Sequence, residues 1–181
     1  MIGRTLALDY GRRRIGVAVS DELGLTARPL ETIDLAAGVG ARPGPTWQAS
    51  PGALRRAAER IVALCREHQP VGLVVGEPRG LDGDAAAGAA WIAERVTELR
   101  EALAAAGQGS LPIHHQDESG STQAALAGAD GPRRNGLRRD RPGRGERNLR
   151  ESGRLDAMAA AVILRQFLAE RANLHDDSKE G

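Results

Sequence analysis

Residues 6–20 read LALDYGRRRIGVAVS, and this stretch decides the fold. Two short runs, over residues 5–10 and 14–20, flank a glycine turn, and the second run is rich in β-branched residues. Runs of this kind on either side of a turn are typical of paired antiparallel strands. The first run contains an acid, Asp9, although aspartate is depleted in strands. Asp9 is therefore either a turn starter or a carboxylate held at a strand end and directed toward a functional site.

The residues after this pair continue the sheet and then add helices. Residues 27–33 predict a third strand, with Pro29 marking an edge, and residues 34–52 have the composition of a loop insertion. Four further elements follow by hydrophobic periodicity. They are a helix from Ser50 or Gly52 to Pro70, a strand over 71–75, a helix through Ile92–Leu103 and a strand over 111–116. Residues 153–171 predict the last helix, which is apolar almost all round and therefore buried.

This order predicts an α/β fold with a five-stranded mixed sheet and helices on both faces. A three-stranded antiparallel meander is joined to βα units, in a single domain over residues 1–171. Residues 121–126 are expected to form one or two helical turns, and residues 127–151 an Arg-rich mobile loop. Residues 172–181 are expected to be a polar tail.

The composition limits the class of protein. The chain has 181 residues, of which 41% are hydrophobic, enough for a real core, and 2% are aromatic. Trp91 is expected in the core more than as a platform on which a base stacks. One cysteine excludes an intrachain disulfide. The sequence shows neither a signal-peptide pattern nor an apolar run of membrane-spanning length. We therefore expect a cytoplasmic protein with no membrane partner.

Charge is distributed unevenly along the chain. The net charge is +1, but residues 132–150 contain eight arginines and two acids, a local charge of +6, which leaves −5 for the remainder. A basic segment on an acidic body favours a polyanionic partner, although a solvated insertion would show the same composition. Arg138, Arg139 and Arg141 are the candidate phosphate contacts in this segment.

Several carboxylates occur at predicted element ends. Asp156 lies in the first turn of the last helix, Asp117 and Glu118 end a strand, and Glu77 follows another strand. Each has an ordinary explanation, because acids suit turns and helix N-termini. If they converge, however, they provide the oxygen ligands that Mg²⁺ and Mn²⁺ prefer, and such ions support phosphodiester cleavage. The sequence has no HxH, HExxH or CxxC motif, which argues against zinc.

Four stretches, in this order, carry a family resemblance: LALDYGRRRIGVAVSDELGLTARPL, LVVGEPRGLDG, LPIHHQDESGSTQAAL and GRLDAMAAAVILRQFL. Together they span most of the chain and resemble the YqgF/RuvX family, which has a ribonuclease H-like fold. The resemblance implies a metal-dependent nuclease that processes the 5′ end of precursor 16S rRNA in ribosome biogenesis. It also implies, as an alternative, a DNA nuclease that resembles Holliday junction resolvases.

The resemblance also implies roles for individual residues. Asp9, Asp117 and Asp156 match the family's catalytic, metal-binding acids, with Mg²⁺ or Mn²⁺ as cofactor, and Arg14 matches its basic residue after the turn. The chain departs from the family at two positions. Ser119 replaces the arginine of an Asp-Glu-Arg motif, and Glu77 replaces an apolar residue. Glu77 and Glu118 are therefore candidate additional acids.

Other functions remain open at this point. A nuclease could act on structured RNA or branched DNA, as a monomer or as a homodimer. An actin-like ATPase or sugar kinase also has an Asp-x-Gly on its first hairpin, but such enzymes bind nucleotide between two domains and this length provides one. A ribosome maturation factor that binds nucleic acid without catalysis would fit the missing arginine at Ser119.

Overall fold

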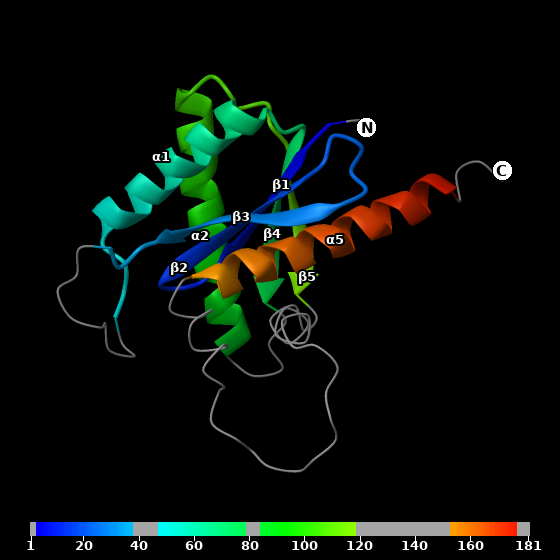
Figure 1. Cartoon of the computed structure of the whole chain (residues 1–181). Coiled ribbons are helices and arrows are strands. Elements are labelled where there is room, and N and C mark those ends of the chain that lie inside the picture. The colour runs from blue at the N-terminus through cyan, green and yellow to red at the C-terminus, as the bar shows by residue number, and fades with distance from the viewer. Residues whose placement is uncertain (1–2, 38–46, 79–83, 119–152, 177–181) are drawn as a thin grey trace, which may run out of the picture.

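The computed structural model describes residues 3–37, 47–78, 84–118 and 153–176, without the side chains of 78, 84–86, 117–118 and 174–176. The described chain contains five strands and three helices (Figure 1). In chain order they are β1 (Thr5–Tyr10), β2 (Arg14–Ser20), β3 (Ala27–Asp34), α1 (Pro51–His68), β4 (Gly72–Pro78), α2 (Asp84–Ala105), β5 (Ile113–Glu118) and α5 (Arg154–Asp176).

The strands form one five-stranded mixed sheet in the order β3-β2-β1-β4-β5. Strands β1, β2 and β3 are paired antiparallel as a meander, whereas β4 runs parallel to β1 and β5 runs parallel to β4. The predicted mixed sheet is confirmed. The central strand is β1, so the residues at its carboxyl end lie in the middle of one sheet edge.

The two faces of the sheet are covered by different helices. Leu6 and Leu8 of β1 belong to a core cluster that includes residues of α1 and α2. Ala7, which points to the opposite face, packs in a second cluster with Ala160 and Leu164 of α5. Figure 1 shows α5 crossing one face of the sheet, with α2 behind it. The predicted helices on both faces are therefore confirmed.

Small residues on the sheet let α5 approach closely. Ala7 and Ala18 form the floor of the second cluster, and Ala160 and Ala161 of α5 are fully buried against it. Gly16 of β2 is tighter still, because a Cβ built there would lie 2.0 Å from the carbonyl oxygen of Asp156. The start of α5 therefore rests directly on the backbone of β2.

The first helix starts and ends as its sequence predicts. The Ser50 side chain accepts a hydrogen bond from the backbone N–H of Ala53 at 3.2 Å, which caps α1. Gln69 then ends the helix in the left-handed conformation at φ 47°. The apolar side of α1 packs in the same core cluster as α2, on the face of the sheet away from α5.

The structure corrects several predicted boundaries. Strand β4 extends to Pro78, so Glu77 lies within a strand and not in the loop after it. Strand β5 begins and ends two residues later than predicted. Helix α5 continues to Asp176, so the first five residues of the expected polar tail are helical. The short helix predicted over 121–126 and the Arg-rich loop over 127–151 lie outside the described residues, as do positions 38–46 of the loop insertion.

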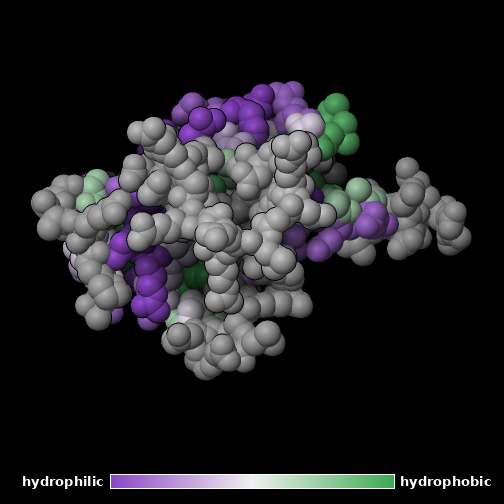
Figure 2. Space-filling view, turned by 60° about the horizontal axis from the view of Figure 1, so that its bottom comes forward, coloured by the Kyte–Doolittle hydropathy of each residue, from purple (hydrophilic) through white to green (hydrophobic). Residues whose placement is uncertain are grey.

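Figure 2 shows the molecule with the lower end of Figure 1 turned forward. Hydrophilic residues form much of the upper rim in this view, and a green hydrophobic group stands at its upper right. The exposed large hydrophobic side chains among the described residues are Leu23 and Leu25, at 67% and 75% exposure, in the turn between β2 and β3. None of the helices in the described ranges has the length and apolar character needed to span a bilayer.

Candidate active site

A row of three paired residues crosses the sheet beneath the start of α5. Asp9 of β1 is the cross-strand partner of Gly16 in β2, and Gly16 is the partner of Thr32 in β3. Directly opposed residues of antiparallel strands direct their side chains to the same face, with Cα atoms about 5 Å apart. Asp9 and Thr32 therefore lie on the face that α5 covers, on either side of Gly16.

The start of α5 is attached to this row. The Thr32 hydroxyl donates a hydrogen bond to the carbonyl oxygen of Gly153 at 2.5 Å. Gly153 has φ 72°, a conformation that glycine adopts without strain, and it turns the chain into the helix. Asp156 follows three residues later, with its backbone against Gly16. The row therefore fixes where the first turn of α5 meets the sheet.

Asp9 and Asp156 are brought together by this packing. Asp9 is the neighbour of Gly16 along the row, and the Asp156 backbone lies on Gly16. Both carboxylates belong to the α5 face, near the end of the central strand. Two acids separated by 147 positions in the sequence thus share one edge of the sheet, and each is only partly buried.

Arg14 provides the positive charge beside Asp156. Its Nη1 atom lies 3.6 Å from Asp156 Oδ2, and both side chains are about one-third exposed, at 35% and 36%. Asp156 Oδ2 accepts no hydrogen bond from the described residues. Burial raises the pKa of the Asp156 carboxyl above its ordinary value, Arg14 opposes this shift and Asp34 adds to it. Arg14 therefore compensates the charge of this partly buried carboxylate only in part.

Asp34 is a neighbour of the site that the sequence analysis missed. It is the cross-strand partner of Arg14, and its carboxylate accepts a hydrogen bond from the backbone N–H of Ala36 at 2.8 Å. Its position two residues after Thr32 puts it on the same face. The sequence shows that Thr32 and Asp34 share a face of their strand. It does not show the register between β2 and β3 that places Asp34 opposite Arg14.

The other predicted acid motif lies on β5. In the backbone register Asp117 is the partner of Glu77, and Glu118 is the partner of Pro78, two strands away from Asp9. The Asp117 and Glu118 side chains belong to the part that the structure leaves undescribed. Ser119, Arg138, Arg139 and Arg141 also lie there.

Glu77 does not join Asp9. Strand β4 lies beside β1 as predicted, but Glu77 alternates with Leu73 and Val75, which pack on the α1 and α2 face. Its Oε1 atom lies 2.7 Å from Nδ1 of His115, a neighbour on β5. The prediction that placed Glu77 near the site was made from strand order, which sets the neighbour but not the face.

A hollow among the described residues also lies on that other face. It has a volume of about 810 Å³ and lies between α1 and α2, with basic and acidic side chains mixed along it, among them Arg55, Arg66, Glu59 and Glu101. It is separated by the sheet from Asp9 and Asp156. Among the described side chains, no three His, Cys, Asp or Glu residues are grouped closely enough to hold a metal ion.

Sequence comparison gives the family of the chain. The family model described as "RuvX: Holliday junction resolvase" matches residues 3–170. The chain belongs to the RuvX family. A Roseiflexus protein named "Putative pre-16S rRNA nuclease" is 34% identical over 166 residues, covering 92% of this chain and 94% of that protein. A Geobacillus kaustophilus protein of the same name is 35% identical, covering 91% and 96%.

A solved structure shows that the chain shares its fold with a resolvase. RuvC of T. thermophilus, solved in complex with a Holliday junction substrate, superimposes with a TM-score of 0.50 at 20% identity. The match covers 94% of this chain and 96% of that one. It confirms the ribonuclease H-like fold that the sequence predicted.

Proposed function

We propose that this RuvX-family chain is a metal-dependent nuclease that hydrolyses phosphodiester bonds near the 5′ end of precursor 16S rRNA. The observation that carries the proposal is the row Thr32–Gly16–Asp9, which brings Asp9 and Asp156 together under the start of α5. The names of the curated relatives support the nuclease activity and the RNA substrate. Nucleic acid is the partner in either case.

The residues present fit a divalent cation. Asp156 Oδ2 lies buried without a hydrogen-bond donor among the described residues, and burial already disfavours its charge. Carboxylates of this kind suit the hard ions Mg²⁺ and Mn²⁺. Asp9 and Asp156 would hold the ion, with Asp117 or Glu118 of β5 as a third ligand. When bound, such an ion supplies Lewis acidity and a water of lowered pKa.

The protein's own contribution is orientation and charge. Strand β1 holds Asp9 rigidly at the centre of the sheet, and Gly16 and Thr32 set the position of Asp156. Arg14 faces Asp156, and its guanidinium carries five N–H donors in a planar fork. It can orient a phosphate oxygen of the substrate while it holds the Asp156 carboxylate in place. Arg14 is therefore the proposed substrate contact of this site.

A second candidate is cleavage of branched DNA. The family name and the fold shared with RuvC favour it. A resolvase must cut two strands and so acts as a homodimer, whereas a nuclease that trims RNA can act as a monomer. The two candidates use the same carboxylates and differ in substrate shape and subunit number.

One experiment separates these functions. Labelled precursor rRNA and a four-way DNA junction are incubated side by side with the protein, in Mn²⁺ and in EDTA. We expect cleavage of the rRNA only with metal, and none by Asp9→Asn. Cleavage of the junction alone would favour the resolvase. Binding without cleavage of either substrate would show a maturation factor with no catalysis and would overturn the nuclease proposal.

A further inference from the structure

A second hollow lies on the α1 and α2 face of the sheet, beside the turn that follows β1. It has a volume of about 150 Å³, and its lining includes Arg12, Trp47, Leu54, Trp91, Glu94 and Arg95. The lining thus includes both tryptophans of a chain that has only four Trp, Tyr and Phe residues in total. Another of these four residues, Tyr10, contacts Trp91 edge-on, with ring centroids 6.3 Å apart. An aromatic-poor protein thus gathers most of its aromatic surface at one place.

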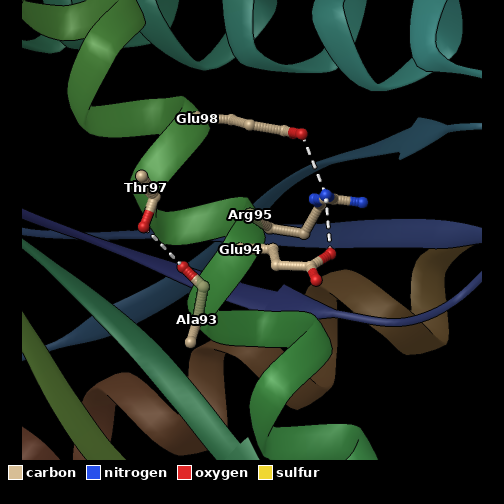
Figure 3. Close-up of polar contacts among 5 residues, drawn as sticks. All are labelled: Ala93, Glu94, Arg95, Thr97 and Glu98. Carbon is tan, nitrogen blue, oxygen red and sulfur yellow. Dashed lines mark hydrogen bonds and ion pairs between the residues drawn. The ribbon is translucent and has the colours of Figure 1, made fainter.

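The aromatic side chains are held in position by charged neighbours on α2. The Arg95 guanidinium carbon lies 5.6 Å from the centre of the Trp91 ring, one helical turn away along α2. Figure 3 shows Arg95 held between two glutamates, at 3.2 Å from Glu94 and 2.8 Å from Glu98. Only 12% of the Arg95 side chain is exposed. The wall formed by Trp91 and Arg95 is therefore ordered before any ligand arrives.

The hollow lies at the same end of β1 as the proposed cleavage site, on the opposite face of the sheet. Tyr10, which supports Trp91, directly follows Asp9, so their Cα atoms are about 3.8 Å apart. The two side chains point to opposite faces of the sheet. Arg12, in the turn that ends β1, lines the hollow and is exposed. A strand that passes Asp9 can therefore reach the hollow by crossing the sheet edge at this turn.

The sequence favoured Trp91 as a core residue over a base-stacking platform, and in the structure Trp91 both packs on the core and lines the hollow. Trp47 and Trp91 both pack against the main core cluster, yet both are only partly buried. A tryptophan that merely completed a core would have no hollow on its open side. Here the open sides face a hollow bordered by an exposed arginine and an exposed carboxylate, Glu94.

We propose that this hollow binds the base of an unpaired nucleotide in the substrate strand. The base would stack on the tryptophan rings, the Arg12 guanidinium would contact its phosphate, and Glu94 would accept a hydrogen bond from an exocyclic amine. Stacking on aromatic rings is the usual way in which proteins recognise unpaired bases, and it tolerates any base. The inference rests on the proposed nuclease function, since the same strand continues past Asp9 and Asp156.

Intrinsic fluorescence tests this directly, because both tryptophans line the hollow. The full chain is titrated in EDTA, without cleavage, with a short single-stranded oligoribonucleotide. A second titration uses the same sugar–phosphate chain without bases. We expect quenching by the first probe only. Trp47→Ala should weaken binding of that probe about tenfold, whereas Trp47→Phe should retain most of it. Equal affinity and equal quenching with the abasic chain would overturn the proposal.

Variants assign the contacts and guard against misfolding. Trp91→Phe and Trp47→Phe each leave one fluorophore, so quenching is assigned to a ring in a protein that keeps its packing. Arg12→Ser should lower the salt slope of binding by about 0.7, and Arg28→Ser, an exposed arginine on the edge strand β3, should leave it unchanged. Equal slopes for the two variants would remove Arg12 from the site.

The outcomes also separate this proposal from the nuclease proposal. Base-dependent quenching by a protein that cleaves no substrate would support the hollow and overturn the nuclease. Asp9-dependent cleavage without base-dependent quenching would support the nuclease proposal and overturn the proposal that the hollow binds a base. Asp9→Asn should quench like the wild type, because Asp9 lies on the other face.

Discussion

Asp9 contributes little to packing, and its proposed role depends on its charge. It is partly buried at the end of β1, while its neighbour Leu8 fills the core. Asp9→Asn preserves the shape and removes the charge. Removing a residue that only hydrogen-bonds to a metal ligand lowers metal affinity or activity about 10–100-fold. Removing a ligand itself should therefore reduce cleavage by more than about 100-fold. The free energy of unfolding should change by less than about 1 kcal/mol. Cleavage assays and urea unfolding measure the two effects.

The matched control is Asp21→Asn. Asp21 lies at the opposite edge of the sheet, where its carboxylate accepts hydrogen bonds from the backbone of Leu25 and the hydroxyl of Thr26. It should cleave at the wild-type rate. If Asp9→Asn cuts as fast as this control, Asp9 is not a ligand.

Asp156 should lower the stability of the metal-free protein. Burial raises its pKa in the folded state, so over the range between the unfolded and folded pKa values the folded protein binds more protons than the unfolded chain. Stability therefore falls as pH rises from the unfolded pKa, about 3.9, through the raised value, and the penalty is complete at neutral pH. Asp156→Asn should be more stable at pH 7 in EDTA, by less than about 1 kcal/mol because the side chain is partly exposed.

The pH dependence gives the check on this prediction. Thermal unfolding of both proteins across the acid range should show the difference vanishing below the unfolded pKa of aspartate. A variant that is less stable than the wild type at neutral pH would mean that the Arg14 ion pair outweighs the burial. Asp156→Asn should also lose any stabilisation by Mn²⁺ that the wild type shows.

Sequence alternation predicted the face of some residues and not of others. The face of Asp9 could be predicted, because Asp9 alternates with Leu6 and Leu8 and shares its face with Ala7. The structure puts the two leucines and Ala7 on different faces of the sheet. Strand β4 is apolar on both faces, so its pattern did not say that Glu77 faces away from α5. The partner of Glu77, His115, depends on the register of β5, which is set by the sheet as a whole.

At the scale of elements, the contact between β2 and α5 positions the site. Gly16→Ala would put a methyl group 2.0 Å from the Asp156 carbonyl oxygen and 2.3 Å from its carbon. Backbone atoms cannot swing aside, so α5 must lift from the sheet. We expect a loss of about 1–3 kcal/mol in urea unfolding, as for other overpacked cores, together with slower cleavage.

Gly52→Ala is the control for this substitution. In the first turn of α1, the added Cβ would make an ordinary 3.5 Å contact with Arg56, so stability should be unchanged or slightly higher. Wild-type stability of Gly16→Ala would mean that α5 does not rest on β2 as described.

The extent of α5 shows what periodicity cannot predict. Its apolar stretch was evident in the sequence, and Ala157, Ala160, Ile163, Leu164 and Phe167 are buried. The helix nevertheless runs on through polar residues to Asp176, where no hydrophobic face marks its continuation. Helix propagation adds a hydrogen bond for each residue fixed, so a helix can extend beyond the contacts that start it.

At the scale of the molecule, the element order was sufficient to predict the sheet. The chain has a hairpin of two short strand-like runs, an edge strand with a proline, and two βα units. These elements leave few arrangements, because parallel strands need crossovers. The Trp47 and Trp91 hollow was not predictable. It depends on how α1 and α2 pack together, and nothing in the spacing of the two tryptophans indicates that they meet.

The Arg-rich segment predicts how the whole molecule meets a polyanion. It carries +6 on a body of −5, and each arginine–phosphate contact releases counterions. Replacing Arg138, Arg139 and Arg141 by serine should weaken binding similarly across sequences. If all three contact phosphate, the salt dependence of binding, measured by titration at several salt concentrations, should flatten by about two units. The control triple Arg28, Arg100 and Arg165 to serine removes the same charge from exposed sites on β3, α2 and α5. Equal effects of the two triples would assign the attraction to net charge, and the segment would then be only a linker.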